Sequence, residues 1–215
     1  MDIKAVLFDC DGTMFDTEIV SQMIWRETAH AHGIELPDNF FIEITGGGDI
    51  KQFYTIDGFE ELTKEMMPKR MDENFWGMIQ YDCLNKKGLI PLFTYLKENG
   101  YKIGICSSSP LSYVKCLLSR VSIELPYDVI VCGDMVKEKK PSPEIFLTAS
   151  KKLNINPQNI LVVEDSKNGI IAATRANMHH CFIFDTIKPD VELKQLIEFE
   201  EDSMDDVISL LEKNK

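Results

Sequence analysis

Short apolar runs alternate with longer amphipathic segments over most of this chain. Five runs, at residues 5–8, 102–106, 127–132, 160–163 and 180–184, are largely apolar and only four to six residues long. Such runs are typical of strands that are buried on both faces of a parallel sheet. The segments between them carry apolar residues at helical spacing. This alternation predicts an α/β fold with a doubly wound parallel sheet.

The helices of this pattern are predicted mainly from their ends. Ser109-Pro110 and Ser142-Pro143 each place a capping residue before a proline, an arrangement that favours a helix start. Asn177 follows a helical segment, where asparagine tolerates the left-handed conformation that ends a helix. The predicted helices cover residues 89–99, 110–120, 143–153, 167–176, 191–196 and 204–211.

Residues 16–85 break the alternation of strands and helices. The pattern predicts a helix at 16–32, followed by helical, amphipathic sequence at 34–85 with a flexible loop at 45–49. This block is therefore expected to be a helical insert, carried by the loop after the first strand. The predicted division is a core domain at 1–15 and 86–215 and a helical domain at 16–85.

Composition and charge narrow the classes of partner. The chain has 215 residues, 44% of them hydrophobic and 27% charged, and a formal net charge of −12. This charge argues against nucleic acid or an anionic membrane surface, although a local cationic pocket can still bind a small anionic substrate. No apolar stretch reaches membrane-spanning length and no signal pattern opens the chain, so a cytoplasmic location is expected. Without an obvious exposed apolar stripe, we expect a monomer.

The six cysteines do not indicate a metal site. None of them forms a C-x-x-C pair, which argues against zinc. Cys10, Cys106, Cys132 and Cys181 lie in or beside predicted strands. We expect them to be small buried thiols in a reducing compartment.

Two carboxylates, Asp9 and Asp11, directly follow the first apolar run. Positions i and i+2 of extended backbone face the same way, and Gly12 then lets the chain turn. Ligands of open α/β sheets bind just outside the carboxyl ends of the strands. Like charges buried side by side cost free energy unless a cation or a reaction uses them. The segment therefore predicts a metal and a nucleophile in one place.

Polar residues also follow the next predicted strands. The serines at 107–109 combine hydroxyls with backbone N–H groups at a helix start, which suits an anion. Lys140 lies directly before a proline and a helix. Its neighbours Lys137 and Lys139 are expected to belong to a solvated charge run, so we favour Lys140 as the cation of a site.

Glu164 and Asp165 end the strand at 160–163 and complete this set. Because all four groups follow parallel strands or leave the same sheet edge, we expect them to converge in one crevice. They supply a nucleophilic carboxylate, hydroxyl and amide donors, a fixed cation and an acidic metal site. Phosphoryl transfer requires these parts, and Mg²⁺ suits a site of few carboxylates and a carbonyl.

The four segments resemble the four motifs of the haloacid dehalogenase-like phosphohydrolases, in the order that this family uses. Asp-Cys-Asp-Gly-Thr at 9–13 is similar to the first motif and Ser107 to the second. Lys140 in Lys-Pro-Ser-Pro resembles the third, and the sequence starting at Glu164-Asp165 resembles the fourth. The resemblance covers nearly the whole chain. It implies a Rossmann-like core with an inserted α-helical cap, as in the β-phosphoglucomutase-like subgroup.

The resemblance also implies roles for single residues. Asp9 attacks phosphorus and forms an aspartyl-phosphate. Asp11 gives a proton to the leaving oxygen and later takes one from water, while its backbone carbonyl binds Mg²⁺. Ser107 holds a phosphoryl oxygen, and Lys140 neutralises the phosphoryl charge. The implied metal residues are Asp9, Asp11, Glu164 and Asp165, and the expected substrate-binding residues are Thr13, Ser108, Gly47 and Gly48.

The resemblance further implies that the cap closes over the crevice and excludes water. Hinges are expected near 14–17 and 85–88, and substrate choice is expected from the cap face at 46–51. The predicted function is a Mg²⁺-dependent phosphatase of a small phosphorylated metabolite, such as a sugar phosphate.

Two alternatives remain on the same fold, a phosphomutase of the β-phosphoglucomutase type and a catalytically silent binding protein. The mutases carry a histidine and an arginine in the cap, but this chain has Ser21 and Asp49 near those positions. Without these groups the second phosphate of a bisphosphate is poorly held, so water is the favoured acceptor. The silent alternative is disfavoured because no motif position has been lost.

Overall fold

Six parallel strands form one sheet in the described part of the computed structural model, which comprises residues 1–44, 50–70, 72–185 and 189–214. The sheet order is β3-β2-β1-β4-β5-β6. The strand order therefore reverses beside β1, and in doubly wound sheets a crevice opens at this point. The strands are β1 Ala5–Phe8, β2 Lys102–Ser107, β3 Val129–Cys132, β4 Ile160–Glu164, β5 His179–Ile183 and β6 Phe199–Glu201.

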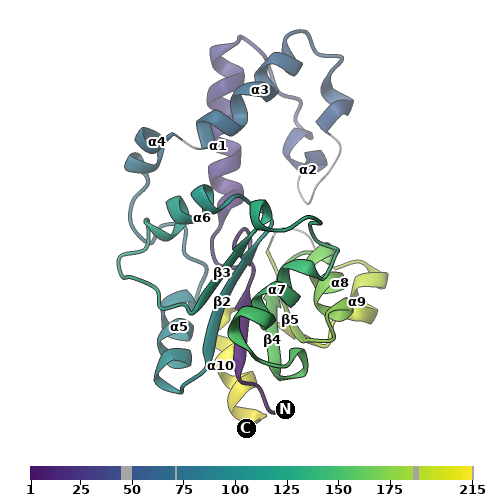
Figure 1. The fold of residues 1–215 in the computed structure, drawn as a ribbon. Coiled ribbons are helices and arrows are strands. Elements are labelled where there is room, and N and C mark those ends of the chain that lie inside the picture. Colours follow the sequence, from purple (N-terminus) through teal and green to yellow (C-terminus); the bar gives the residue numbers. More distant parts are fainter. Residues whose placement is uncertain (45–49, 71, 186–188, 215) are drawn as a thin grey trace.

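Helices cover both faces of this sheet (Figure 1). Val6 and Phe8 of β1 face a core shared with α5, α6 and α10, whereas Ala5 and Leu7 face a second core shared with α7 and α8. Alternate side chains of one strand thus enter two cores, which explains the uninterrupted apolar run. The bounds are α5 Leu89–Glu98, α6 Leu111–Leu118, α7 Glu144–Leu153, α8 Lys167–Arg175, α9 Val191–Leu196 and α10 Met204–Lys213. Short 3₁₀ turns lie at Ile50–Phe53, Gly133–Met135 and Pro157–Asn159.

The α/β architecture predicted from the sequence is confirmed, but one strand was missed. The short strand β6 pairs with β5 at the edge of the sheet, where Cys181 lies opposite Phe199. Its three residues, Phe-Glu-Glu, form no apolar run because an edge strand is partly solvated. The sequence pattern predicts only helices in this tail. Of the cysteines, Cys10, Cys106, Cys132 and Cys181 are buried free thiols, as expected.

Two predicted helix caps differ from the observed ones. The helix α6 begins after Pro110, and the Ser109 hydroxyl donates to Asp11 instead of capping the helix. Helix α7 begins after Pro143, one residue later than predicted. In both segments the proline is the last residue before the helix. The prediction for Asn177 is confirmed, since it has a φ of 57°.

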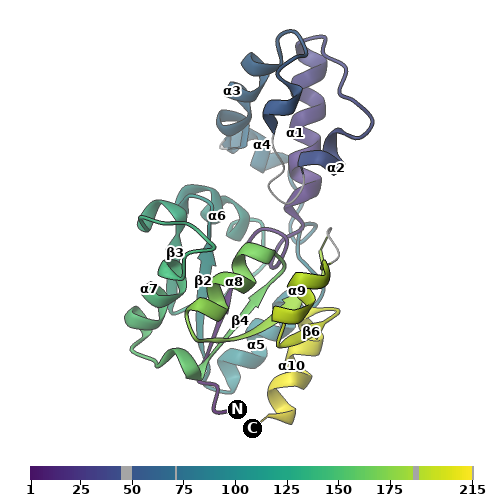
Figure 2. The same cartoon turned by 90° about the vertical axis from the view of Figure 1, so that its right-hand side faces the viewer.

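Helices α1 to α4 stand beyond the carboxyl end of the sheet (Figures 1 and 2). Their own core is aromatic: Trp25 stacks on Phe59 at 5.8 Å between ring centroids and meets the edge of Phe40 at 5.0 Å. Phe53 packs against Phe40 at 4.9 Å. These rings belong to the same contiguous cluster of buried residues as Val6 and Phe8 of the sheet, so the packing of the helices continues into the core on that side. Their bounds are α1 Thr17–Ala31, α2 Phe40–Ile44, α3 Phe59–Arg70 and α4 Glu73–Met78.

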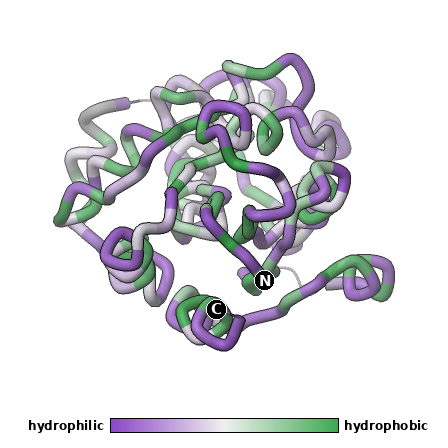
Figure 3. Tube along the Cα trace, turned by 60° about the horizontal axis from the view of Figure 1, so that its bottom comes forward, coloured by the Kyte–Doolittle hydropathy of each residue, from purple (hydrophilic) through white to green (hydrophobic). Residues whose placement is uncertain are grey.

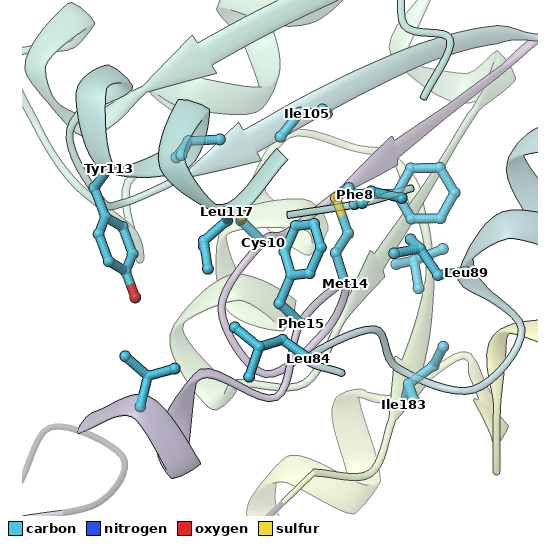
Figure 4. Close-up of a cluster of buried hydrophobic side chains, with 14 of the residues drawn as sticks. Phe8, Cys10, Met14, Phe15, Leu84, Leu89, Ile105, Tyr113, Leu117 and Ile183 are labelled. Atoms are coloured by element: carbon cyan, nitrogen blue, oxygen red, sulfur yellow. The ribbon is translucent and has the colours of Figure 1, made fainter. Parts of the chain in front are cut away.

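The two connections between the helices and the sheet run side by side. The Asp16 N–H donates to the Leu84 carbonyl at 2.8 Å, and the Lys86 N–H donates to the Met14 carbonyl at 3.0 Å. Phe15 lies in the apolar cluster beneath them, together with Met14 and Leu84 (Figure 4). Both connections are therefore anchored in the core next to the loop that follows β1.

The two chain ends lie close together (Figure 3), at the opposite end of the molecule from α1 to α4 (Figure 1). The N-terminal ammonium of Met1 donates to the Asn214 carbonyl at 2.9 Å. No helix in the described ranges is both long and apolar enough to cross a membrane.

Candidate active site

The loop after β1 places the first pair of carboxylates at the carboxyl edge of the sheet. The Asp9 N–H donates to the Val163 carbonyl at 3.0 Å, which continues the pairing of β1 with β4. Gly12 adopts a φ of 82°, so the chain turns directly after Asp11. A Cβ at Gly12 would lie 2.3 Å from Oδ2 of Asp165. The glycine therefore allows the carboxylate of Asp165 to approach the first loop closely.

Lys140 lies at the centre of the site. Its ammonium donates to Oδ1 of Asp9, to Oε1 of Glu164 at 2.6 Å and to the Cys106 carbonyl at 3.0 Å. An ammonium has three N–H donors, so all of them are used. The side chain is only 4% exposed. Burial opposes its charge, but Asp9 and Glu164 outweigh this effect and raise the pKa of Lys140, so it remains protonated.

Asp9 is a buried carboxyl group that pairs with one cation, Lys140, among the residues that the structure describes. Burial raises its pKa to about 8; Lys140 opposes the shift, and the charges of Glu164 and Asp11 add to it. The shared ammonium of Lys140 holds Oδ1 in place. The other oxygen, Oδ2, accepts no hydrogen bond from the residues that the structure describes. Asp9 thus has the position expected of a fixed nucleophile.

Glu164 is fully buried and has no free oxygen. Its Oε1 accepts from Lys140, and its Oε2 accepts from the N–H groups of Asp165 and Ser166 at 2.9 and 2.8 Å. The hydroxyl of Ser166 donates to the same oxygen at 2.9 Å. A Cβ at Gly169 would lie 1.8 Å from this carboxyl group. Glu164 therefore packs against helix α8 and positions Lys140, and the structure does not direct it toward a metal.

Asp165 lies beside Asp9, and within the described ranges no cation pairs with it. Thr13 donates its hydroxyl hydrogen to Oδ1 of Asp165 at 2.7 Å, and burial together with Glu164 and Asp9 raises its pKa well above the usual range. Within the described ranges, no three Asp, Glu, His or Cys side chains are arranged as a metal site on their own. A site formed by Asp9, Asp165 and the backbone carbonyl of Asp11 needs only two such side chains. An excess of buried negative charge at this point fits a divalent cation.

Asp11 faces the serines that follow β2. Its Oδ2 accepts from the hydroxyl of Ser109 at 2.8 Å and, at a longer 3.4 Å, from that of Ser107. Ser107 in turn accepts from the Ser109 N–H at 3.0 Å. The other oxygen of Asp11, Oδ1, is buried and has no partner among the described groups. This oxygen is the free end of an otherwise fixed carboxyl group.

The predicted substrate-binding residues differ in their placement. Thr13 binds Asp165, so its hydroxyl supports the carboxylate cluster. Ser108 packs its backbone against Gly133, where a Cβ would lie 2.1 Å from the Ser108 carbonyl oxygen. Gly47 and Gly48 lie outside the described residues. Asp49, which lies near the position of the cap arginine of the mutases, is also outside the described residues.

The structure adds groups that the sequence pattern did not reveal. Lys86, in the second connection, pairs with Asp185 at 2.6 Å, and Asp185 contributes to the raised pKa of Asp165. Arg70 at the end of α3 reaches Tyr113 of α6. These contacts join segments far apart in sequence, so spacing gives no signal for them. The position of Asp185 just after β5, at the edge shared with Asp9 and Asp165, was the one available indication.

Comparison with known proteins places this geometry in a family. The family model described as "Haloacid dehalogenase-like hydrolase" matches residues 6–183. The chain therefore belongs to the haloacid dehalogenase-like hydrolase family. The predicted enzyme class, a phosphoric monoester hydrolase of this family, is confirmed.

Several relatives are similar over most of their length. The "Phosphorylated carbohydrates phosphatase" of Thermotoga maritima is 29% identical over 182 residues, covering 84% of each chain. The "Validoxylamine A 7'-phosphate phosphatase" of Streptomyces hygroscopicus is 27% identical over 181 residues, covering 81% of this chain and 83% of that protein. The crystal structure of a β-phosphoglucomutase from Clostridium difficile superposes with a TM-score of 0.73 at 28% identity, covering 98% of this chain and 96% of that one. These similarities agree with the core and inserted helices described above.

Proposed function

We propose that the protein is a Mg²⁺-dependent phosphatase that hydrolyses a small phosphorylated metabolite through an aspartyl-phosphate. The observation that carries this proposal is the contact between Lys140 and Asp9. Beside it lies Asp11, whose Oδ2 is hydrogen-bonded and whose Oδ1 has no partner among the described groups. The names of the relatives support a sugar phosphate or a similar phosphomonoester as the substrate.

In the first half-reaction, an oxygen of Asp9 attacks phosphorus while the ester P–O bond breaks. Lys140 keeps the carboxylate oriented, and its positive charge lowers the cost of bringing an anionic phosphoryl group close. Asp11 gives its proton to the departing oxygen. Oδ1 of Asp11 is the suitable atom, because Oδ2 is already held by Ser109.

In the second half-reaction, water attacks the aspartyl-phosphate and loses a proton to Asp11. The acyl-phosphate bond breaks, inorganic phosphate is released and the carboxylate of Asp9 is restored. Ser107 lies at the end of β2 next to Asp11, where its hydroxyl can donate to a phosphoryl oxygen. Glu164 holds Lys140 throughout, and both its oxygens remain in use.

The residues that would hold Mg²⁺ are Asp9, Asp165 and the backbone carbonyl of Asp11. The bound ion would offset the negative charge of the phosphoryl group and the carboxylates. Thr13 fixes one oxygen of Asp165 and leaves the other beside Gly12. We do not propose the phosphomutase, because residue 21 on α1 is a serine and supplies no positive charge there.

A phosphate-release assay over a panel of phosphorylated metabolites tests the proposal, with Mg²⁺ and with EDTA. We expect metal-dependent release from one or a few small phosphomonoesters. The matched control is Asp9→Asn, which keeps the size and the hydrogen-bonding oxygen of the side chain. Conversion of β-glucose 1-phosphate to glucose 6-phosphate with a bisphosphate primer, without phosphate release, would contradict the phosphatase and establish the mutase.

A further inference from the structure

A further acidic side chain, Asp185, lies at the carboxyl end of the sheet beside the carboxylates that would hold Mg²⁺. It follows strand β5, which ends at Ile183 and pairs with β4. A Cβ at Gly12 would lie 3.2 Å from Oδ2 of Asp185 and 2.3 Å from Oδ2 of Asp165. Both oxygens therefore lie against the same point of the loop after β1, so Asp185 is a close neighbour of Asp165.

The charge of Asp185 reaches Asp165. Burial is the main cause of the raised pKa of Asp165, and the charge of Asp185 adds to it, as do the charges of two other carboxylates. Each of these charges repels the ionised form of Asp165. A divalent cation bound at Asp165 would instead be attracted by all of them, because its charge has the opposite sign.

Asp185 is not placed to complete a set of direct metal ligands. Within the described ranges, no three Asp, Glu, His or Cys side chains are arranged to hold an ion together. Mg²⁺ gives up its water reluctantly and is usually bound through only one or two carboxylates. A further carboxylate close by can still attract the partly hydrated ion through its charge.

Lys86 balances the charge of Asp185. Its ammonium lies 2.6 Å from Oδ1 of Asp185, and the two side chains are only 20% and 15% exposed. At this degree of burial, salt and water screen the two charges less than on an open surface. The backbone of Lys86 is fixed as well, because its N–H donates to the Met14 carbonyl at 3.0 Å. The lysine is thus held both by the backbone and by its ion pair.

We propose that Asp185 increases the Mg²⁺ affinity of the site by electrostatic attraction and that Lys86 limits this attraction. The inference rests on the proposed function, because it concerns the Mg²⁺ site of the phosphatase. The carboxylate favours the bound cation and the ammonium opposes it, so the two partners of one ion pair act with opposite signs. A pair that only stabilised the fold would have effects of the same sign when either partner is lost. The direction of the change in Mg²⁺ affinity therefore distinguishes the two roles.

Asp185→Asn and Lys86→Met each remove one charge and keep the approximate size of the side chain. Binding of Mn²⁺ is followed by the EPR signal of the free hydrated ion, and competition with Mn²⁺ then gives the Kd of Mg²⁺. No substrate is present, so the measurement does not depend on activity. We expect Asp185→Asn to raise the Kd by about 10-fold and Lys86→Met to lower it by about 3-fold. Thermal unfolding without metal checks that each variant is folded.

Lys102 and Asp128 form a matched control pair. Their Nζ and Oδ1 atoms are also 2.6 Å apart. Lys102 is the first residue of β2 and therefore lies at the amino end of the sheet, whereas the site lies at the carboxyl end. Asp128→Asn and Lys102→Met remove the same two charges away from the ion. We expect both to leave the Kd of Mg²⁺ within about 2-fold of the wild-type value, because distant charges are screened.

Asp165→Asn separates this inference from the proposed function, because it removes a proposed direct ligand. If Mg²⁺ binds this variant as well as the wild type, the proposed metal site is wrong and the inference falls with it. If Asp165→Asn weakens binding but Asp185→Asn and Lys86→Met fail to change the Kd in opposite directions, the inference is wrong and the phosphatase function stands. Opposite changes in these two variants, with both control variants unchanged, support the inference.

Discussion

The carboxyl edge of the sheet and the helical insert differ in the interactions that stabilise their side chains. At the sheet edge, Lys140, Asp9 and Glu164 bind one another and the backbone, so the charges are held by a network. In the insert, Trp25 and Phe59 form part of an aromatic core, and the polar groups lie mainly around it. Rigid charge suits bond breaking, whereas a helical layer held by aromatic contacts can vary the face that it turns toward the sheet edge. We infer that the first region fixes the reaction and the second fixes which molecule undergoes it.

Asp9→Asn, at the sheet edge, is expected to have the largest effect on turnover. Without the carboxylate that we propose as the nucleophile, we expect turnover to fall by about 10⁴-fold or more, as for other catalytic nucleophiles. Phosphate release checks the rate, and thermal unfolding checks that the fold is intact. Substantial residual turnover would remove Asp9 as the nucleophile.

Asp11→Asn is expected to have the next largest effect, about 10²- to 10⁴-fold on turnover, because proton transfer is lost in both half-reactions. The amide still accepts from Ser109, so the local geometry should be kept. Because dephosphorylation also slows, phosphoenzyme should accumulate and be detectable by intact-mass measurement. Turnover at the wild-type rate would contradict the acid–base role.

Gly169→Ala tests how rigid the sheet edge is. The new Cβ would lie 1.8 Å from the Glu164 carboxyl, so Glu164 and then Lys140 must shift. We expect a loss of about 1–3 kcal/mol in the free energy of unfolding, together with lower kcat.

Gly77→Ala in helix α4 is the matched control for this substitution. Nothing lies within 4 Å of a Cβ at that position. Because alanine has the higher helix propensity, we expect a gain of about 0.5–1 kcal/mol. Chemical denaturation measures both variants. Equal effects on kcat in the two would refute the contrast between the regions.

Phe59→Leu in the insert is expected to have the smallest effect on chemistry. It removes the ring that stacks on Trp25 and costs about 1–1.5 kcal/mol of stability. If selectivity resides in the insert, KM for the preferred substrate should rise while hydrolysis of acetyl phosphate, a minimal phosphoryl donor, stays within about 2-fold, since additive distant effects are small. A selective loss of acetyl phosphate hydrolysis would count against the division of labour.

The strands could be predicted because burial on both faces leaves a continuous apolar run. The same reasoning predicts that Asp9 and Lys140 lie at one edge of the sheet, because the carboxyl ends of parallel strands meet there. It failed at Ser109, because a serine before a proline is compatible both with a helix cap and with a bond to Asp11. It also failed at β6, where an edge strand carries two glutamates.

The pairing of Arg70 with Tyr113 lies beyond any local pattern. The two residues are 43 positions apart, and only the packing of the insert onto α6 brings them together. The hydrogen bonds of Glu164 could not be predicted from local sequence either. Its place at the end of β4 could be predicted, but the use of both its oxygens depends on the fold of the loop that follows.

The side-by-side connections at Asp16–Leu84 and Met14–Lys86 have a consequence for engineering and for evolution. The insert enters and leaves through adjacent backbone, so its removal leaves two ends that a short turn can rejoin. Any segment whose own ends lie equally close can be grafted at this point without changing the order of the strands. The sheet and the helical insert are, in this sense, exchangeable parts, and chimeras with the corresponding inserts of relatives would be joined here.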